Sequence, residues 1–120
     1  MRDILIADDD GALRRALKLA LEAAGYRVRE AAHGAEALAL QRQAPADVLI
    51  TDLFMPESDG FEAIDGFRRA FPGTKIVAMS GGSRRMKQQY LPVAALAGAD
   101  ATLAKPFQME KLLGTLRSLS

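Results

Sequence analysis

The sequence predicts an α/β fold, in which a parallel sheet is covered by helices on both faces. Two observations carry this prediction. Five short segments rich in β-branched and other apolar residues alternate strictly with five segments in which apolar residues recur every three or four positions. Parallel strands need long crossover connections, which helices supply, so this alternation indicates repeated strand–helix units.

The five expected strands are short, and their apolar residues run together as they do in strands that are buried on both faces. The third is the clearest, because Val48-Leu49-Ile50 leads directly to Asp52. The strands are expected at residues 4–6, 28–31, 48–50, 75–79 and 101–104. Right-handed crossovers leave few ways to order them. At this chain length the common order is 2-1-3-4-5, that of a flavodoxin-like (βα)5 doubly wound parallel sheet.

The helices are expected between and after these strands, at residues 13–24, 35–43, 61–71, within 81–97 and at 109–119. Gly25 follows the first helix and suits a left-handed cap, while Pro45 ends the second. The fourth helix is the hardest to place. Pro92 either delays its start or kinks it, and Gly81-Gly82 favours a mobile loop before a shortened helix.

Composition indicates one domain spanning residues 1–120. Hydrophobic residues make up 49% of the chain and charged residues 26%, the balance of an ordinary folded protein. No apolar run approaches the ~20 residues that span a bilayer, no signal peptide precedes the first strand, and no cysteine is present, which together favour the cytoplasm. A net charge of +1 gives no general drive toward nucleic acid, and the basic cluster Arg84, Arg85 and Lys87 is most simply a solvated loop.

Polar residues that can bind a metal or take part in catalysis follow the ends of the expected strands. Asp8 and Asp9 follow the first strand, Asp52 the third, Ser80 the fourth and Lys105 the fifth. In a doubly wound sheet the carboxyl ends of the strands share one edge, where ligands bind, so these residues are expected in one pocket. Crowded carboxylates repel one another and require a cation. An all-oxygen set of two or three protein ligands suits Mg²⁺, which keeps several waters and takes a phosphate partner.

This set of groups fits phosphoryl transfer to an aspartate. Asp52 would be the nucleophile, Lys105 would hold one phosphoryl oxygen, and the Ser80 hydroxyl would donate to another. Two other polar residues have simpler interpretations. Asp10 is expected to be the N-cap of the first helix, and His33, alone in a strand-to-helix loop, a surface residue.

Four motifs resemble those of response regulator receiver domains, in the family's order and spacing. They are Ile-Leu-Ile-Ala-Asp-Asp at 4–9, Asp-Leu-Phe-Met-Pro at 52–56 with Asp59-Gly60, Met-Ser-Gly-Gly at 79–82, and Gly-Ala-Asp at 98–100 leading to Lys-Pro-Phe at 105–107. The resemblance covers essentially the whole chain. It implies a switch of a two-component phosphorelay and not an enzyme, apart from Mg²⁺-dependent self-phosphorylation from small donors and self-catalysed dephosphorylation.

The resemblance also implies a role for each site residue. Asp52 would be the phosphoacceptor, and Ser80 and Lys105 would contact the phosphoryl group. Mg²⁺ would be held by oxygen ligands that follow the first and third strands: Asp9, Asp52 and the main-chain carbonyl of Phe54, with Asp8 acting through a bound water. The Lys105–Pro106 peptide bond would be cis.

Partners follow from the same resemblance. A sensor histidine kinase or a histidine phosphotransfer protein would donate the phosphoryl group. The phosphorylated form would signal through a downstream protein, at the face of the fourth helix, fifth strand and fifth helix, because ending at Ser120 leaves no room for an output domain. No direct contact with nucleic acid or a membrane is expected, and the protein would be a monomer or a phosphorylation-linked dimer.

Three features depart from the family's usual pattern. The residue three before the lysine is usually aromatic and turns inward on activation, but here it is Thr102. Tyr90 is a candidate replacement, but an aromatic residue on a helix face more often only packs, and packing is the favoured interpretation. The stretch at 81–97 is about three residues longer than usual. Phe54 and Gly82 occupy the positions that, in this family, flank the water molecule that attacks the acyl phosphate during dephosphorylation.

Two other functions stay open. Asp8-Asp9-Asp10 also resembles the first motif of haloacid-dehalogenase phosphatases, in which Asp8 would be the nucleophile and Asp10 the acid–base group. No late acidic pair follows Lys105, however, as that family needs. A pseudo-receiver would keep the fold as an interaction module without phosphorylation. The full acidic set argues against it, because carboxylates crowded without a ligand cost stability.

Overall fold

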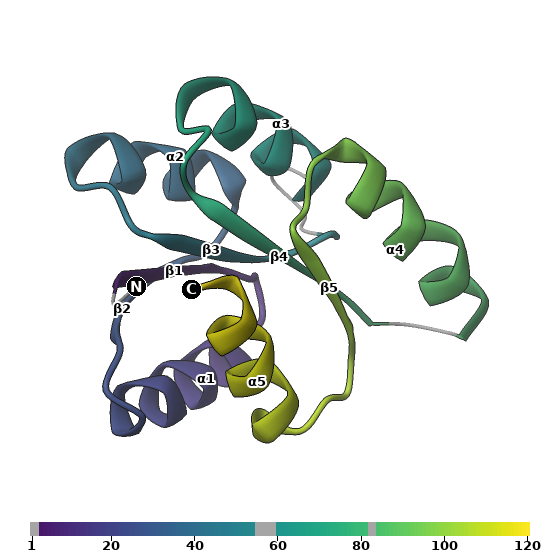
Figure 1. Ribbon diagram of the computed structural model, residues 1–120, viewed down its shortest axis with the longest axis horizontal. Coiled ribbons are helices and arrows are strands. Elements are labelled where there is room, and N and C mark those ends of the chain that lie inside the picture. Colours follow the sequence, from purple (N-terminus) through teal and green to yellow (C-terminus); the bar gives the residue numbers. More distant parts are fainter. Residues whose placement is uncertain (1–2, 55–59, 82–83) are drawn as a thin grey trace.

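The computed structural model of the protein describes residues 3–54, 60–81 and 84–120, of which 84–87 contribute backbone only. Within them, five strands alternate with five helices (Figure 1). The strands are β1 (Asp3–Ala7), β2 (Arg27–Ala31), β3 (Val48–Asp52), β4 (Lys75–Ser80) and β5 (Ala101–Ala104). The helices are α1 (Gly11–Ala23), α2 (Gly34–Gln43), α3 (Gly60–Ala70), α4 (Arg84–Ala97) and α5 (Met109–Leu119). Among the described residues, no helix combines the length and the apolar character that crossing a membrane requires.

The strands form one parallel sheet in the order β2-β1-β3-β4-β5, which confirms the predicted fold class and strand order. In the central pairing, Ile4 of β1 lies opposite Val48 of β3. Strand β3 is buried along its whole length, and β1 and β4 are buried except at their first residue. Burial on both faces explains why these strands are continuous apolar runs and do not alternate with polar residues.

Helices α2, α3 and α4 cover one face of the sheet, and α1 and α5 cover the other (Figure 1). Two apolar clusters result, because successive residues of a strand point to opposite faces. Leu5 and Leu49 belong to the cluster under α2, α3 and α4. Ile4 and Ile50, their chain neighbours, belong to the cluster under α1 and α5. The two layers hold the strands in register and so position the residues that follow them.

Capping interactions define several helix ends. Asp10 is the N-cap of α1, as predicted, and its side chain accepts a hydrogen bond from the Leu13 N–H at 3.1 Å. Gly25 has φ 99°, the left-handed conformation predicted for the residue after this helix. His33 does more than occupy the surface. Its Nδ1 accepts a hydrogen bond from the Glu36 N–H at 3.2 Å and so caps α2.

The prediction of a shortened fourth helix was wrong. Helix α4 has 14 residues, the longest of the described helices, and continues through Pro92. Proline removes one N–H donor from the helix, but packing against β4, β5 and α3 holds the segments on both sides, and Ala94 is fully buried. The basic cluster Arg84, Arg85 and Lys87 was also expected in a loop, but the backbone of these residues forms the first turn of α4. Their side chains and Gly82 lie outside the described residues, so the role of Gly82 stays a prediction.

Candidate functional site

The predicted site residues converge at the carboxyl edge of the sheet. Asp8 directly follows β1, Asp52 ends β3 and Ser80 ends β4. Lys105 follows β5, and its N–H donates to the main-chain carbonyl of Ser80 at 2.8 Å. One carboxylate oxygen from each of Asp8, Asp9 and Asp52 can be chosen so that all three lie within 4.8 Å of one another. Residues almost a hundred positions apart therefore share one site.

Lys105 links the two buried carboxylates. Its Nζ donates to Oδ2 of Asp8 at 2.8 Å and lies 3.5 Å from Oδ1 of Asp52. The side chain of Lys105 is 19% exposed, whereas those of Asp8 and Asp52 are 1% and 11% exposed. Water and salt therefore screen these attractions less than they would at the surface. The Lys105–Pro106 bond is cis, as the family resemblance implied.

Asp8 makes more direct contacts than the sequence indicated. In addition to the bond from Lys105, its Oδ1 accepts a hydrogen bond from the Asp10 N–H at 2.9 Å. Its main-chain carbonyl accepts a hydrogen bond from the Arg14 guanidinium, which also forms an ion pair with Glu30 at 3.0 Å. Sequence reasoning missed Arg14, because a basic residue on a helix carries no signal for such a contact. The action of Asp8 through a bound water stays a prediction.

The donor chemistry of the site fits a divalent cation. Lys105 supplies one positive charge against the three carboxylates of Asp8, Asp9 and Asp52, so the cluster retains negative charge. All three offer oxygen, the ligand that Mg²⁺ prefers. Asp9 is exposed, which leaves one side open to the waters that Mg²⁺ keeps.

The pKa of Asp52 is raised from 3.8 to about 6, and burial is the largest cause. The charge of Asp8 also acts to raise this pKa, while the charge of Lys105 and the hydrogen bonds that the carboxylate accepts act to lower it. For Lys105, burial alone would lower the pKa, but the hydrogen bond to Asp8 and the charges of Asp52 and Asp8 outweigh burial and raise the pKa above 10.5. Lys105 therefore stays charged at neutral pH, and Asp52 is the group whose charge changes near pH 6.

The raised pKa of Asp52 predicts how the stability of the metal-free protein depends on pH. The pKa in the folded state, about 6, lies above the ordinary value of 3.8. Stability from protonated Asp52 is thus fully present below about pH 4 and is lost as the pH rises through about 6. In EDTA, Asp52→Asn is expected to unfold at a higher temperature than the wild type near neutral pH, with the difference shrinking toward about pH 4. Thermal unfolding across this range measures the effect.

Asp65→Asn is the matched control for this measurement. Asp65 is exposed on α3 and, among the described residues, forms an ion pair only with Arg69 four residues later, so its replacement should keep the wild-type pH profile. Equal unfolding temperatures of Asp52→Asn and the wild type near neutral pH would contradict the raised pKa.

Ser80 and Gly60 shape the site in different ways. Ser80 is fully buried, and its hydroxyl donates to the Gly81 carbonyl at 3.3 Å, a long distance for an O–H donor, which leaves it available to a stronger acceptor. A Cβ on Gly60 would overlap the main-chain oxygen of Asp52 and press on Leu53. Glycine therefore lets α3 begin directly against the end of β3. The sequence marked Gly60 only as part of a family motif and did not indicate this contact.

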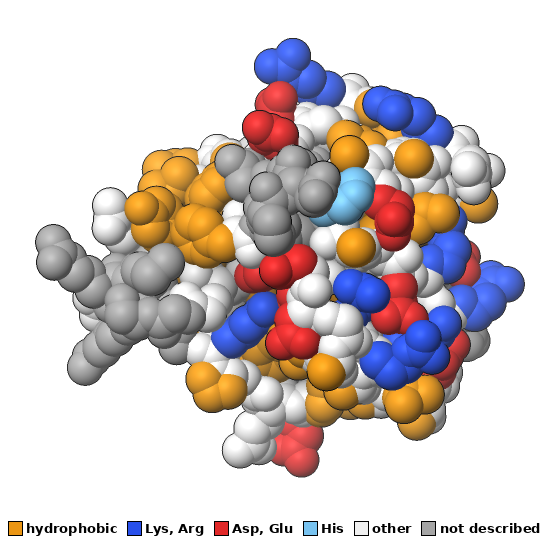
Figure 2. All heavy atoms as spheres, turned by 180° about the vertical axis from the view of Figure 1, so that it is seen from behind, with side chains coloured by type: hydrophobic (Ala, Val, Ile, Leu, Met, Phe, Trp, Pro, Cys, Tyr) orange, Lys and Arg blue, Asp and Glu red, His pale blue; other side chains and the backbone are white. Residues whose placement is uncertain are grey.

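Charged side chains of both signs lie on the surface of the molecule (Figure 2). Figure 2 shows acidic and basic side chains interspersed over one face of the molecule, with no large area of a single sign among the residues described there. This face does not offer the uniform positive potential that binding to a nucleic acid backbone uses. Hydrophobic side chains gather on the side of this face where α4 lies, at the left of Figure 2.

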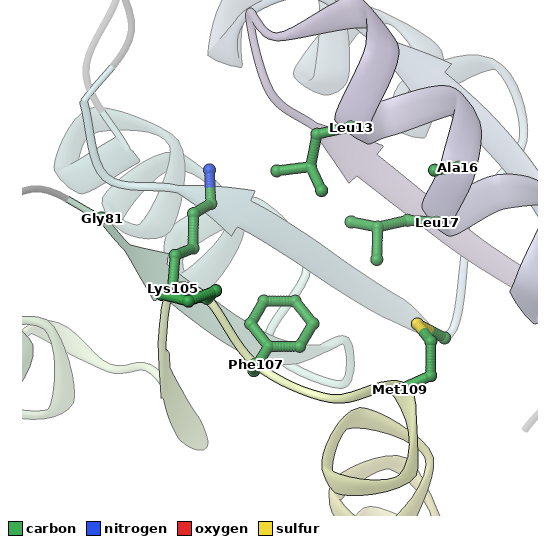
Figure 3. A pocket seen from close by; sticks show the side chains of 8 residues that line it. Leu13, Ala16, Leu17, Gly81, Lys105, Phe107 and Met109 are labelled. Carbon is green, nitrogen blue, oxygen red and sulfur yellow. The ribbon is translucent and has the colours of Figure 1, made fainter.

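An apolar pocket of about 490 Å³ adjoins the site between α1 and the segment that follows β5. Figure 3 shows Leu13, Leu17, Phe107 and Met109 pointing toward one space, while the amine of Lys105 points away from them. The remaining lining residues are Ala16, Gly81 and Pro106. Lys105 thus separates a charged site from a hydrophobic hollow.

Comparisons with known proteins agree with one another. Residues 4–117 match the family model described as a response regulator receiver domain. The transcriptional regulatory protein KdpE of Mycobacterium tuberculosis is 36% identical over 115 residues, which are 96% of this chain and 49% of KdpE, so the chain spans about half the length of this relative. The solved structure of the chemotaxis response regulator CheY4 of Vibrio cholerae is 35% identical with a TM-score of 0.87, and the match covers 100% of this chain and 99% of that one. The response regulator TrrA of Thermotoga maritima, solved in complex with Mg²⁺–BeF, is 28% identical with a TM-score of 0.86, and the match covers 100% of both chains.

Proposed function

Because the chain belongs to the response regulator receiver domain family, we propose that Asp52 is its phosphoacceptor and that the acidic cluster around Asp52 holds Mg²⁺. The domain is a phosphorylation-activated signalling switch of two-component systems and not a conventional enzyme. The observation that carries the assignment is the amine of Lys105, 2.8 Å from Asp8 and 3.5 Å from Asp52. It puts a fixed positive charge where the oxygens of a phosphoryl group on Asp52 would need one.

Asp9 and Asp52, with the main-chain carbonyl of Phe54, would hold the metal, and Asp8 would act through a bound water while fixing Lys105. Bound Mg²⁺ would supply positive charge that offsets the carboxylates and the phosphoryl oxygens. The oxygen-only donor set and the open side at Asp9 support this choice of metal. The crystallised complex of TrrA with Mg²⁺–BeF is consistent with it.

The proposed reaction is transfer of a phosphoryl group from a phosphohistidine to Asp52. A carboxylate oxygen of Asp52 attacks phosphorus, a P–O bond forms as the P–N bond breaks, and the imidazole leaves as it takes up a proton. The Lys105 ammonium and the Ser80 hydroxyl stabilise negative charge on the transferring oxygens. Attack by water on the acyl phosphate later releases inorganic phosphate and restores the Asp52 carboxylate, which resets the switch.

A sensor histidine kinase or a histidine phosphotransfer protein is the proposed donor, in the cytoplasm. Its phosphohistidine must reach the carboxyl edge of the sheet, and the apolar pocket beside Lys105 gives hydrophobic side chains of the donor a place to pack. A downstream protein would bind the face of α4, β5 and α5, where Val93 and Leu96 of α4 are 46% and 89% exposed. The oligomeric state, monomer or phosphorylation-linked dimer, stays a prediction.

This function predicts that Mg²⁺ raises the unfolding temperature, because an ion that binds only the folded state stabilises it. Beryllofluoride added with Mg²⁺ should raise the temperature further. Asp9→Asn is expected to remove most of the Mg²⁺ response, and the fold should tolerate the change because Asp9 is exposed. Differential scanning fluorimetry at increasing Mg²⁺ concentration measures both effects.

Asp10→Asn provides the matched control. Asn caps helices as well as Asp does, so the neighbouring substitution keeps α1 intact and should keep the full Mg²⁺ response. An Asp9→Asn protein that responds to Mg²⁺ as strongly as the wild type would remove Asp9 from the metal site.

A further inference from the structure

Phe54 and Tyr90 join the loop that follows Asp52 to helix α4. Phe54 lies two residues after Asp52, and Tyr90 lies within α4. Their ring centroids are 5.0 Å apart and their planes meet at 80°, an edge-to-face geometry that is favourable for aromatic pairs. The site and a helix encoded more than thirty residues later are therefore in direct contact.

The two rings are held very differently. Tyr90 is half-buried and packs against the apolar cluster under α2, α3 and α4. Phe54 is 38% exposed and belongs to neither apolar cluster of the described residues. Tyr90 is thus anchored in the body of the protein, whereas Phe54 is held by neither apolar cluster and is free to move with its own backbone.

Helix α4 contains a proline close to Tyr90. Pro92, two residues after Tyr90, has no N–H, so the helix lacks one i→i−4 hydrogen bond there and bends at lower cost. Val93 and Leu96, which follow it, are among the few exposed large hydrophobic residues described in the chain. Strand β5, Ala-Thr-Leu-Ala, offers no ring that could serve instead, because Thr102 stands at its centre.

We propose that Tyr90, through its contact with Phe54, couples phosphorylation of Asp52 to a change in the packing of α4. The inference rests on the proposed function, in which the main-chain carbonyl of Phe54 binds Mg²⁺. If the Phe54 carbonyl is a metal ligand, loading the site would shift the Phe54 backbone, and the ring, which moves with it, would change its edge-to-face contact with Tyr90. Tyr90 then alters the packing of α4 next to Pro92, and the exposed side of the helix at Val93 changes position.

Fluorine NMR tests this coupling directly. Tyr26 and Tyr90 are the two tyrosines of the chain, so incorporation of 3-fluorotyrosine gives two resonances, which Tyr26→Phe assigns. With Mg²⁺ and beryllofluoride, the Tyr90 resonance is expected to shift by more than its line width, while that of Tyr26, at the turn between α1 and β2, stays in place. In Phe54→Leu, which keeps the main-chain carbonyl but removes the ring, most of the Tyr90 shift should be lost.

Phe71→Leu is the matched control. Phe71 is also a half-buried ring, but it lies between the end of α3 and the start of β4, at the edge of the sheet opposite the site, so its removal should leave the Tyr90 shift unchanged. An equal Tyr90 shift in Phe54→Leu and the wild type would overturn the coupling. So would an unmoved Tyr90 resonance in a wild-type sample whose unfolding temperature rises with beryllofluoride. Absence of that rise would instead overturn the proposed function, and the coupling with it.

Discussion

Asp52→Asn is expected to abolish phosphorylation by acetyl phosphate and to remove the added stabilisation by beryllofluoride. The amide oxygen of Asn is neutral and a poor nucleophile, and the substitution also removes one charged metal ligand. Residue 52 is buried, but the Asn side chain has nearly the same shape as Asp, so it should fit the site and the protein should still fold. Intact-mass spectrometry after incubation with Mg²⁺ and acetyl phosphate should show one added phosphoryl group in the wild type and none in the variant.

Asp8→Asn separates this function from a phosphatase that uses Asp8 as nucleophile. The Asp8 carboxylate is already bonded by Lys105 and by the Asp10 N–H, and the residue is fully buried, which leaves it poorly placed to attack. Asp8→Asn should therefore react more slowly, because Lys105 loses its partner, but should still be modified. Modification that survives in Asp52→Asn and disappears in Asp8→Asn would favour the phosphatase. A wild type that responds to neither acetyl phosphate nor beryllofluoride would favour a pseudo-receiver.

Lys105→Met is expected to slow phosphorylation by acetyl phosphate by about 10²–10³-fold, the usual effect of removing one group that stabilises transferring oxygens. Methionine keeps much of the apolar stem that lies against Gly81 but removes the charge. Loss of the charge also raises the pKa of Asp52 further, because Lys105 is the main group that lowers it. Rapid-mixing measurements at saturating Mg²⁺ and several pH values give the rate and its pH dependence.

Lys75→Met controls for the removal of a positive charge as such. Lys75 is exposed at the first residue of β4, whereas the site lies beyond the last residue of that strand, so its replacement should leave the rate unchanged. Lys105→Arg should recover part of the rate, since it keeps the charge but not the shape. A Lys105→Met protein that reacts at the wild-type rate would show that the amine does not contact the phosphoryl group.

The sheet and the convergence of the site residues could be predicted from the sequence, because both follow from local patterns combined with topology. A central strand buried on both faces must be an apolar run, as at Val48-Leu49-Ile50, and the run itself marks the strand. Once the strands are parallel, Asp8, Asp52 and Lys105 must share an edge. Asp10 was equally predictable as a cap, because capping involves residues only three positions apart.

Features that depend on contacts between distant elements could not be predicted in this way. Helix α4 continues through Pro92 because of its packing on the sheet, which no helix propensity describes. Which carbonyl Arg14 reaches depends on where Glu30 of β2 holds its guanidinium. The pairing of Phe54 with Tyr90 requires α4 to lie beside the loop after β3, and the sequence indicates each ring but not their contact.

Locating the phosphoryl group tests the central claim most directly. Borohydride reduces an acyl phosphate on aspartate to homoserine, and cleavage after Lys and Arg separates Asp52, in the peptide 43–68, from Asp8 and Asp9, in the peptide 3–14. After reaction with Mg²⁺ and acetyl phosphate, tandem mass spectrometry is expected to find homoserine at position 52. Homoserine at position 8 or 9, with Asp52 unmodified, would contradict the assignment.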